Sequence, residues 1–555
     1  MSPSNDFSSG SSTSNGENNT NNAEVVIVGA GFGGIYLLNH LRNHGYNVRI
    51  FEAGADLGGV WWWNSYPGAR VDTSFPMYEF AAQELWEDWT WKEKFPGRDE
   101  LMEYFGHVDK KWDVRRHIQF NTMVDKCVFD IVDEEWTVYT SRGNIVKTKF
   151  VLLATGFAAK HYTPPIKGLD NFQGISCHTA HWPKEGIDIA GKRVGVIGTG
   201  ASGVQVIQEI GQKVKHLTVF QRTANTALPM RQKRAGSLEV ANQNQRKSEY
   251  PALFDLTRKT FAGWDYDQLS KLSTDDSPEA REALWEDLWV QGGFHPWLGN
   301  YQDLLTNQDL NNSFYNFWRN KVRARITKHD PELLENLAPE LPENPFGTKR
   351  PSLEQQYYEI YNQSNVDLVN IRKNPIIEVS ATGVKTLNGE IPLDILILAT
   401  GFDAVTGSIL QIDIEGIDGK KLADKWKEGS STYLGIATAG FPNLLFMYGP
   451  QSPTAFAIGP RISEIQGDWI ISCLNSMRAH KQTRIDALTS AENAWSAETN
   501  AITNATLIAK SDSWYMGANI PGKPREALNY MGGMPKYTDI IERCAKDGYN
   551  GFVLT

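Results

Sequence analysis

Cysteine is scarce in this sequence, and no two cysteines lie close together. The chain of 555 residues has only Cys127, Cys177, Cys473 and Cys544, with no pair in a CxxC spacing. A disulfide framework, a structural zinc site or an iron–sulfur cluster needs thiols that are more numerous or more closely spaced. The sequence therefore argues against all three, predicts no metal site and favours a reducing compartment.

Long apolar runs and an excess of basic residues are also missing. No stretch of about eighteen consecutive apolar residues occurs, and the N-terminus lacks the pattern of a secretory signal. The 55 Lys and Arg face 65 Asp and Glu, a net charge of -10, whereas nucleic acids and anionic membranes attract basic surfaces. We therefore expect a cytoplasmic protein that acts on a small molecule, without a nucleic-acid, membrane or protein partner.

Composition sets the N-terminal end of the chain apart from the rest. Residues 1–22 are almost entirely Ser, Asn, Gly, Thr and acidic residues, which bury too little apolar surface to offset the entropy of ordering. We expect this segment to be a disordered tail. The rest of the chain is too long for one ordinary core and predicts two to four units.

A glycine-rich turn follows the first apolar strand. The run AEVVIVGAGFGG, which begins at Ala23, holds Gly29, Gly31 and Gly34 in the spacing G-x-G-x-x-G and leads into an apolar-periodic helix. In this pattern a pyrophosphate meets the helix N-terminus, and an acidic residue after the second strand accepts hydrogen bonds from the ribose. Glu52 stands at that place, so the segment predicts a dinucleotide site.

The same pattern recurs 169 residues later, with Gly198, Gly200 and Gly203 in the run KRVGVIGTGASG. Here the second strand ends in Arg222 and Thr223 instead of an acid. A guanidinium pairs with a 2′-phosphate, which a carboxylate would repel, so this site favours NADPH over NADH. The loop residues between its glycines are part of the same predicted site: Thr199, Ala201 and Ser202.

These two copies predict an α/β fold with two Rossmann-like dinucleotide-binding domains. Two similar strand ends, VLLATGF at 151–157 and LDILILATGF at 393–402, suggest that the second domain is inserted within the first. The expected division gives the first domain residues 23–155 and 394–555, and the second 156–225 and 336–393. Residues 226–335 are polar, Trp-rich and helix-like, and we expect a helical insertion there.

Two bound dinucleotides serve three broad kinds of chemistry: reducing a disulfide, passing electrons onward, or activating dioxygen. The first needs a close cysteine pair and the second an electron acceptor such as an iron–sulfur cluster, and neither set of thiols is present. Oxygen activation therefore remains.

Between the two glycine turns, the run FQGISCHTAHWP has the spacing F-x-G-x-x-x-H-x-x-x-W-P, formed by Phe172, Gly174, His178, Trp182 and Pro183. This run resembles the signature of type I Baeyer-Villiger monooxygenases, which are class B flavoprotein monooxygenases. The run GGVWWWNSYPGARVD also looks like a motif of that family, through Gly59, Trp61, Tyr66, Pro67, Gly68 and Asp72. The resemblance extends from Ala23 to about Tyr537 and includes the runs FGTKRP and SDSWYMGANIPGK.

The resemblance implies that the first site holds FAD, which NADPH reduces and which then forms a C4a-peroxide with dioxygen that attacks a ketone. The product is an ester or lactone. Arg350 corresponds to the cation that stabilises the peroxide and the tetrahedral adduct, and it stays protonated at any working pH. Asp72 matches a carboxylate near that arginine and is expected to orient it. Both are our candidate catalytic residues.

Further cofactor-binding residues come from the same resemblance. Lys349 is expected to clamp the 2′-phosphate together with Arg222, and Trp514 to hydrogen-bond to the nicotinamide end of NADP. We expect His178 to be a hydrogen-bonded hinge. The segment from Gly449 to Pro460 matches a loop beside the flavin and suits an apolar ketone, cyclic or linear. The remaining expected contacts are Val60, Trp61, Trp62, Trp63, Arg70, Val71, Asp72, Tyr78, Val124 and Arg350.

Two other functions stay open at this point. One is a flavin monooxygenase that oxidises nitrogen or sulfur, a class that usually lacks the Trp-Pro ending of the signature. The other is a flavin-bearing sensor or binding protein whose catalytic groups have decayed. The presence of Trp182, Pro183, Arg350 and Asp72 favours the ketone monooxygenase.

Overall fold

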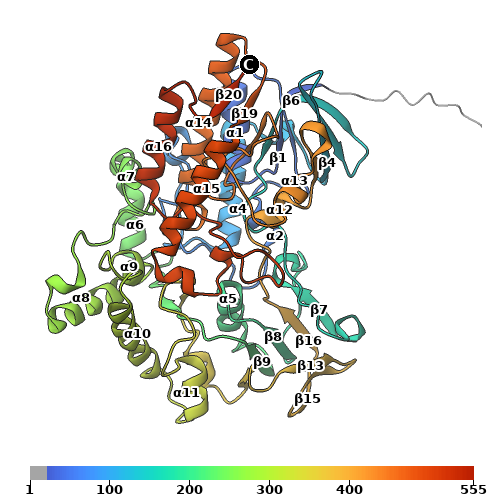
Figure 1. Ribbon diagram of the computed structural model, residues 1–555. Helices are drawn as coiled ribbons and strands as arrows, with labels where there is room; N and C mark the ends of the chain where they lie inside the picture. The colour runs from blue at the N-terminus through green and yellow to red at the C-terminus, as the bar shows by residue number, and fades with distance from the viewer. Residues whose placement is uncertain (1–21) are drawn as a thin grey trace, which may run out of the picture.

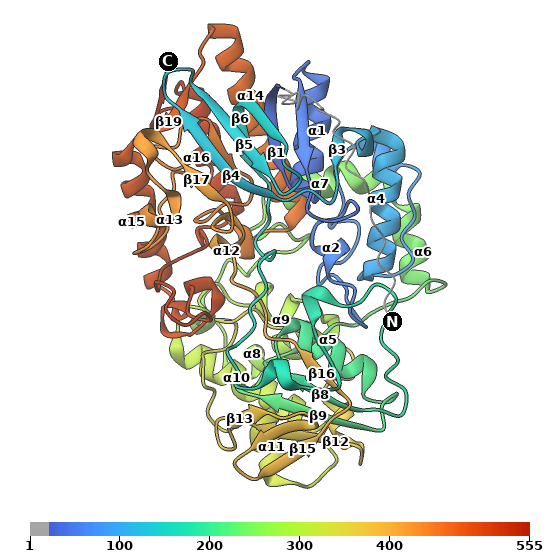
Figure 2. The same ribbon diagram turned by 90° about the vertical axis from the view of Figure 1, so that its right-hand side faces the viewer.

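The computed structural model describes residues 22–555. These residues form two adjoining α/β halves, and the first half lies above the second in both Figure 1 and Figure 2. Each half contains one main sheet. The tail expected at residues 1–22 lies outside the described residues apart from Asn22.

The first half contains β1 (Ala23–Val28), which is apolar except for Glu24 and lies between two parallel neighbours, β2 and β6. The sheet order is β17-β4-β5-β6-β1-β2-β3, with β18 also paired to β6, and β4 to β6 form an antiparallel meander. Helix α1 (Phe32–Asn43) follows β1 directly. The other strands are β2 (Val48–Phe51), β3 (Ile118–Gln119), β4 (Val124–Asp130), β5 (Glu135–Thr140), β6 (Ile145–Leu153), β17 (Asp413–Glu415) and β18 (Leu444–Phe446).

Helices from both ends of the sequence cover this sheet. The long helix α14 packs on α1 and on α16, so the C-terminal part of the chain completes the first half (Figure 1). In the part of the chain that the structure describes, no helix has the length and apolar content needed to span a lipid bilayer. The helices of this half are α2 (Val60–Trp63), α3 (Gln83–Trp86), α4 (Arg98–Trp112), α12 (Thr406–Ile409), α13 (Leu422–Lys425), α14 (Gly459–His480), α15 (Thr489–Asn504) and α16 (Met534–Lys546), with β19 (Ile485–Ala487) and β20 (Phe552–Leu554) beside them.

The second half has a five-stranded parallel sheet in the order β12-β9-β8-β16-β7. Helix α5 (Ala201–Ile210) follows β8 and repeats the strand-turn-helix unit of the first half. The strands are β7 (Ile175–His178), β8 (Arg193–Ile197), β9 (His216–Gln221), β12 (Val366–Asn370) and β16 (Ile395–Leu398). A small antiparallel sheet lies beside them, formed by β13 (Ile376–Val379), β14 (Gly383–Thr386) and β15 (Gly389–Pro392).

The domain boundary expected at residue 394 is wrong, because it assigns β16 to the first half. The four residues of β16 are buried and pair with β8 on one side and β7 on the other. An apolar strand of this kind requires neighbours on both edges, and the second sheet provides them. The chain returns to the first half only after Leu398.

The two segments that cross between the halves run next to each other. The backbone N–H of Tyr162 donates to the carbonyl of Gly401 over 2.8 Å, and the Thr400 hydroxyl donates to the carbonyl of Tyr162 over 2.6 Å. His161 and Phe402 form a further backbone bridge. The connection between the halves therefore consists of two extended segments that hydrogen-bond to each other.

Residues 226–337 are mostly helical. The two helices at residues 238–257 pack against the first half, whereas those from residue 278 on lie beside the second sheet (Figure 1). Their tryptophans fill the same apolar core as that sheet, including Trp285, Trp297 and Trp318. The short strand β10 (Leu228–Pro229) pairs with β11 (Leu353–Glu354), which fixes the chain just after Arg350. The helices are α6 (Leu238–Gln245), α7 (Tyr250–Thr257), α8 (Pro278–Gln291), α9 (His295–Leu298), α10 (Gln308–Arg323) and α11 (Pro331–Leu337).

Candidate active site

Both glycine turns have the close packing that a dinucleotide fold requires. Gly29 has a φ of +103°, and a Cβ there would lie 2.5 Å from the carbonyl oxygen of Ala154. A Cβ on Gly34 would lie 1.9 Å from the carbonyl oxygen of Gly29. Only glycine fits at these two positions, because any side chain would separate the strand from the helix.

The second turn repeats this geometry. Gly198 has a φ of +109° and faces the carbonyl of Ala399, and Gly203 lies against the carbonyl of Gly198. A Cβ on Gly200 would meet nothing within 4 Å, so there is room in front of the helix. Neither α1 nor α5 has a side-chain cap at its N-terminus. Such a helix end offers backbone N–H groups and a positive partial charge to a pyrophosphate.

Glu52 lies beside the first turn and is 5% exposed. Its carboxylate accepts hydrogen bonds from the backbone N–H groups of Ala30, over 2.7 Å, and Gly54, over 2.6 Å. Burial raises the pKa of Glu52, and these two hydrogen bonds oppose that rise. A carboxylate has about four lone-pair sites, so two remain for the hydroxyls of a ribose. The residues of this turn fit FAD.

Arg350 and Asp72 form an ion pair between the two halves. The Nε of Arg350 donates to Oδ2 of Asp72 over 2.9 Å, and Nη1 donates to the carbonyl of Ala455 over 2.9 Å. The side chain of Arg350 is 20% exposed and that of Asp72 is 31% exposed. Burial alone would lower the pKa of Arg350, but the charge of Asp72 and the hydrogen bond to it raise the pKa above its ordinary value. The guanidinium is therefore a fixed cation.

Aromatic rings enclose this guanidinium. Its carbon lies 4.7 Å from the ring centre of Phe294 and 6.0 Å from that of Trp264. The ring of Phe456 lies 5.0 Å from that of Tyr515, whose hydroxyl is buried without a protein partner. An apolar surrounding strengthens the interaction of a cation with any negative charge that develops next to it.

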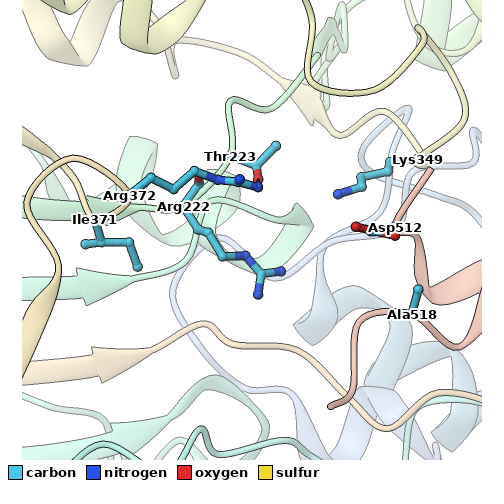
Figure 3. Close-up of a pocket in the computed structure, with 7 residues that line it drawn as sticks. All are labelled: Arg222, Thr223, Lys349, Ile371, Arg372, Asp512 and Ala518. Atoms are coloured by element: carbon cyan, nitrogen blue, oxygen red, sulfur yellow. Dashed lines mark hydrogen bonds between the residues drawn. The ribbon is translucent and has the colours of Figure 1, made fainter. Parts of the chain in front are cut away.

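A cavity of about 330 Å³ opens at the end of β9, lined by Arg222, Thr223, Lys349, Ile371, Arg372, Asp512 and Ala518. Figure 3 shows that Lys349 approaches from the side opposite to Arg222 and Thr223, with Asp512 close to it. Burial lowers the pKa of Lys349, and the charge of Arg222 lowers it further. This set of cations and one hydroxyl fits the 2′-phosphate of NADP.

Arg372 is a residue of this cavity that the sequence analysis missed. It comes two residues after β12, which pairs with β9 in parallel, so both strands end at the same edge of the sheet. Residues that follow two neighbouring parallel strands lie close together at the same edge of the sheet. A cation soon after the strand that pairs with β9 could therefore have indicated a further residue of the phosphate site.

Trp514 lies at the junction of the two halves. Its ring stacks on Phe157 at 5.6 Å, and Phe157 in turn stacks on Tyr448 at 5.7 Å. The loop that carries Trp514 is held to the crossing segment because Lys523 donates to Asp403 over 2.7 Å. Trp514 therefore lies against the two segments that connect the halves, beside Phe157, which follows β6.

Several other predicted residues lie near the turns with partners of their own. The indole of Trp61 donates to the hydroxyl of Tyr78 over 3.2 Å, and Lys184 lies 4.5 Å from the ring centre of Trp62. Trp63 packs on His181. Val60 begins α2, and Thr199 donates to the carbonyl of Thr223. Ala201 and Ser202 form the first turn of α5.

Three predicted cofactor contacts use their side chains elsewhere. Arg70 donates to Glu93 over 2.9 Å. The side chains of Val71 and Val124 are both 3% exposed, and each is part of an apolar core. Val71 and Val124 therefore stabilise the protein fold through their side chains, whereas the Nε of Arg70 is buried without a protein partner.

His178 ends β7 and is 6% exposed. Its Nδ1 accepts a hydrogen bond from the backbone N–H of Ala180 over 3.0 Å. Burial, with smaller contributions from His161 and His181, lowers the pKa of His178 to about 4. The imidazole is therefore neutral at pH 7, with one ring nitrogen hydrogen-bonded and Nε2 buried without a protein partner. The hinge role of His178 stays a prediction.

Comparison with known proteins gives a consistent assignment. The model of the flavin-binding monooxygenase-like family matches residues 22–236. Cyclopentanone 1,2-monooxygenase of a Comamonas species is 46% identical over 97% of this chain and 98% of its own length. Phenazine N-monooxygenase of Lysobacter antibioticus is 36% identical over 97% of this chain and 98% of its own length.

Solved structures agree with the sequence comparison. A crystal structure of OTEMO in complex with FAD and NADP superimposes with a TM-score of 0.91 at 38% identity, covering 96% of this chain and 99% of the other. The two glycine turns, the Arg350–Asp72 pair and the cationic cavity stand on an architecture shared over the full described length. The chain belongs to the Baeyer-Villiger monooxygenases, with one Rossmann-like half for FAD and one for NADP.

Proposed function

We propose that this protein inserts one oxygen atom of dioxygen beside the carbonyl of an apolar ketone, using FAD and NADPH, and releases an ester or a lactone. The observation that carries the proposal is the Arg350–Asp72 ion pair, held between the two dinucleotide turns and enclosed by aromatic rings. When bound, FAD and NADPH supply hydride transfer and the activation of dioxygen.

The residues of this chain bind, orient and stabilise charge. Asp72 fixes the guanidinium of Arg350 through Nε, and the carbonyl of Ala455 fixes it through Nη1. A guanidinium has five N–H donors, so further donors are present for a substrate oxygen. Negative charge that develops on that oxygen is stabilised by the fixed cation. The loss of one such group costs about a hundredfold or more in rate.

The surroundings of Arg350 favour an apolar substrate. Phe294 and Trp264 present aromatic surface beside the guanidinium, and Phe456 packs on Tyr515, which also interacts electrostatically with Arg350. A ketone has one acceptor and an apolar body, which matches such a wall. We place the protein in the cytoplasm, because its four cysteines are free.

Oxidation of a nitrogen or sulfur atom is the second candidate. The 36% identity to a protein named phenazine N-monooxygenase supports it, because one fold serves both reactions. The two differ in the state of the oxygen donor: an anion attacks a carbonyl carbon, whereas a protonated donor transfers oxygen to a nucleophile. The cation at Arg350 favours the anion.

A substrate panel tests the proposal. The purified FAD-loaded protein is supplied with NADPH, air and, separately, cyclic ketones, linear ketones, an organic sulfide and an aromatic amine, with product identification by mass spectrometry. We expect an ester or lactone from at least one ketone. Sulfoxide or N-oxide formation without an ester from any ketone would establish the second candidate, and no NADPH consumption with any substrate would point to a binding protein.

A further inference from the structure

The edge of the second sheet brings two arginines together beside the cavity. Arg222 follows β9, and Arg372 follows β12, whose Asn370 pairs with Gln221 of β9. The Nε of Arg372 donates to the carbonyl of Arg222 over 2.9 Å. This contact fixes the guanidinium of Arg372 at the cavity wall, where Figure 3 shows it next to Thr223.

A carboxylate occupies the same donors. Nη2 of Arg372 lies 2.7 Å from Oε2 of Glu343, and the hydroxyl of Thr223 donates to that same oxygen over 3.0 Å. Nη2 of Arg372 also lies 3.3 Å from the Thr223 hydroxyl oxygen. One oxygen of Glu343 therefore holds two groups that a phosphate oxygen would bind.

The charges around the cavity are nearly balanced. Arg222, Lys349 and Arg372 line the cavity as cations and Asp512 as a carboxylate. Glu343 lines the adjoining pocket, which shares Arg222 with this cavity and also contains Glu335 and Lys373. Asp512 is 81% exposed and pairs with Arg525, so its charge is largely screened by solvent. Glu343 is 36% exposed and has its partners on the cavity wall itself. Glu343 is therefore the carboxylate that most directly opposes an incoming dianion.

We propose that Arg372 is a third cation that recognises the 2′-phosphate of NADPH, and that Glu343 competes with this phosphate for Arg372 and Thr223. The pair then sets how strongly the protein discriminates NADPH from NADH. This proposal rests on the use of NADPH in the proposed function, but it concerns binding alone.

Calorimetry on the FAD-loaded protein tests the proposal with two probes that differ only in the group of interest. Adenosine 2′,5′-bisphosphate carries the 2′-phosphate, and adenosine 5′-monophosphate lacks it. The ratio of their dissociation constants measures recognition of the 2′-phosphate. The variants are Arg372→Gln, Glu343→Gln and the control Lys373→Gln. Lys373 carries the same charge one residue away, but it lines the adjoining pocket and not this cavity, and it pairs with Glu332.

The three variants have distinct expected results. Arg372→Gln weakens binding of the bisphosphate about fivefold, a modest factor because the side chain is 57% exposed. Glu343→Gln tightens it about threefold, because Arg372 and Thr223 no longer hold an anion. Lys373→Gln changes it less than about twofold, since a solvated charge at longer range is screened. Binding of the monophosphate stays the same in all three.

Two results overturn the proposal. If Arg372→Gln and Lys373→Gln weaken bisphosphate binding equally, the effect of Arg372 is general electrostatics. If Glu343→Gln leaves binding unchanged or weakens it, Glu343 does not compete with the phosphate. Retention of bound FAD, read from its absorbance, shows that each variant is folded. Because the probes carry no nicotinamide, the result does not depend on whether the protein oxidises a ketone.

Discussion

At the scale of single residues, the central group is the guanidinium of Arg350, which several partners hold in one position. Arg350 is held by Asp72, by the carbonyl of Ala455 and by the ring of Phe294, and these partners come from three separate parts of the sequence. A guanidinium fixed in this way needs no reorganisation when charge develops beside it.

We expect Arg350→Ala to separate the two half-reactions. Reduction of the bound flavin by NADPH, followed anaerobically by absorbance, should continue, whereas ester formation from the best ketone should fall by about a hundredfold or more. Arg246→Ala, which removes an exposed arginine paired with Glu249, is the control and should leave both rates unchanged. A variant at position 350 that still makes ester at the normal rate contradicts the proposed role of Arg350.

The depressed pKa of His178 predicts a pH dependence of stability. Between its ordinary value of 6.5 and about 4, the unfolded chain binds a proton at this residue and the folded chain does not. The free energy of unfolding therefore falls as the pH drops through this window, by at most about 1.4 kcal/mol per pH unit. His161 and His181, which also face this site, contribute equally to both proteins compared below.

His178→Asn keeps an acceptor for the backbone N–H of Ala180 but has no proton to gain. Its melting temperature, measured against the unmodified protein at pH 7.5, 6.5 and 5.5, should improve in relative terms at the lowest pH, by the equivalent of about 1 kcal/mol. Parallel melting curves for the two proteins over this range would show that His178 does not titrate as the structure indicates.

Residue types with one chemical use were the most predictable from sequence. The glycines of both turns have the close packing that their pattern predicts, Arg350 pairs with Asp72, and Arg222 and Lys349 line one cavity. Their contacts with the cofactors stay a prediction. Arg372 and Glu343 were missed, because an exposed arginine and an exposed glutamate are ordinary on any surface. Their importance comes from the pairing of β9 with β12, which joins residues about 150 positions apart.

At the scale of elements, the loop that carries Trp514 is tied down at several points. Lys523 donates to Asp403 and to the carbonyl of Ala404, and Asn519 donates to the carbonyl of Phe402. Lys160, from the other crossing segment, also pairs with Asp403 over 3.1 Å. The loop is therefore bound to the segment at residues 402–404, and this segment is in turn paired with Lys160 of the other connecting segment.

We expect Lys523→Met to loosen this loop, because the substitution keeps an unbranched side chain one atom shorter and removes the charge that binds Asp403. Hydrogen exchange at residues 512–526 should become faster, and more NADPH should be consumed per ester formed, with hydrogen peroxide as the by-product. Lys536→Met is the control, since Lys536 pairs with Glu498 at the surface. Unchanged exchange in the Lys523 variant would show that the loop is held by its other contacts alone.

The strands and helices next to the glycine turns follow from the sequence, because apolar strands and periodic helices have strong local patterns. The domain boundary could not be placed correctly from the sequence, because two similar runs belong to different sheets. The runs ending in LATGF at 153–157 and 398–402 look alike, yet the first strand, β6, lies in the first sheet and the second, β16, lies in the second sheet. Sequence shows that a buried strand ends there but not which sheet contains it.

At the scale of the whole molecule, one cavity is built from distant parts of the chain. Its walls come from residues 222–223, from residues 349 and 371–372, and from residues 512 and 518 in the C-terminal loop. A ligand in this cavity contacts the second half and the loop that folds back from the first. Binding therefore couples the two halves.

We expect NADP⁺ at about a hundred times its dissociation constant to raise the melting temperature by about 2 to 5 °C, because it binds only the folded protein. NAD⁺ at the same concentration is the control and should give a much smaller shift, since it lacks the 2′-phosphate. The shift for NADP⁺ should also shrink in Arg222→Ala. Equal shifts for the two nucleotides would contradict the assignment of the cavity to the 2′-phosphate.

The fold class and the family were predictable from sequence, and the comparisons confirm both. The packing of the two halves was not, because it depends on contacts such as Lys523 with Asp403 and Trp514 with Phe157, which no local pattern encodes. Contacts between residues far apart in the sequence depend on how the folded elements pack, whereas a sequence motif indicates only the local structure around it.

The adjacency of the two crossing segments has a consequence for protein engineering. Tyr162 and Gly401 are joined by a backbone hydrogen bond of 2.8 Å, so the second half enters and leaves the first at nearly one point. A unit whose ends meet can be cut out and the gap rejoined with a short loop, or given new ends elsewhere, without stretching the host. A related second half with another cofactor preference could therefore be grafted at this junction, provided that the core residues it shares with the first half, such as Tyr66 and Phe456, are kept matched.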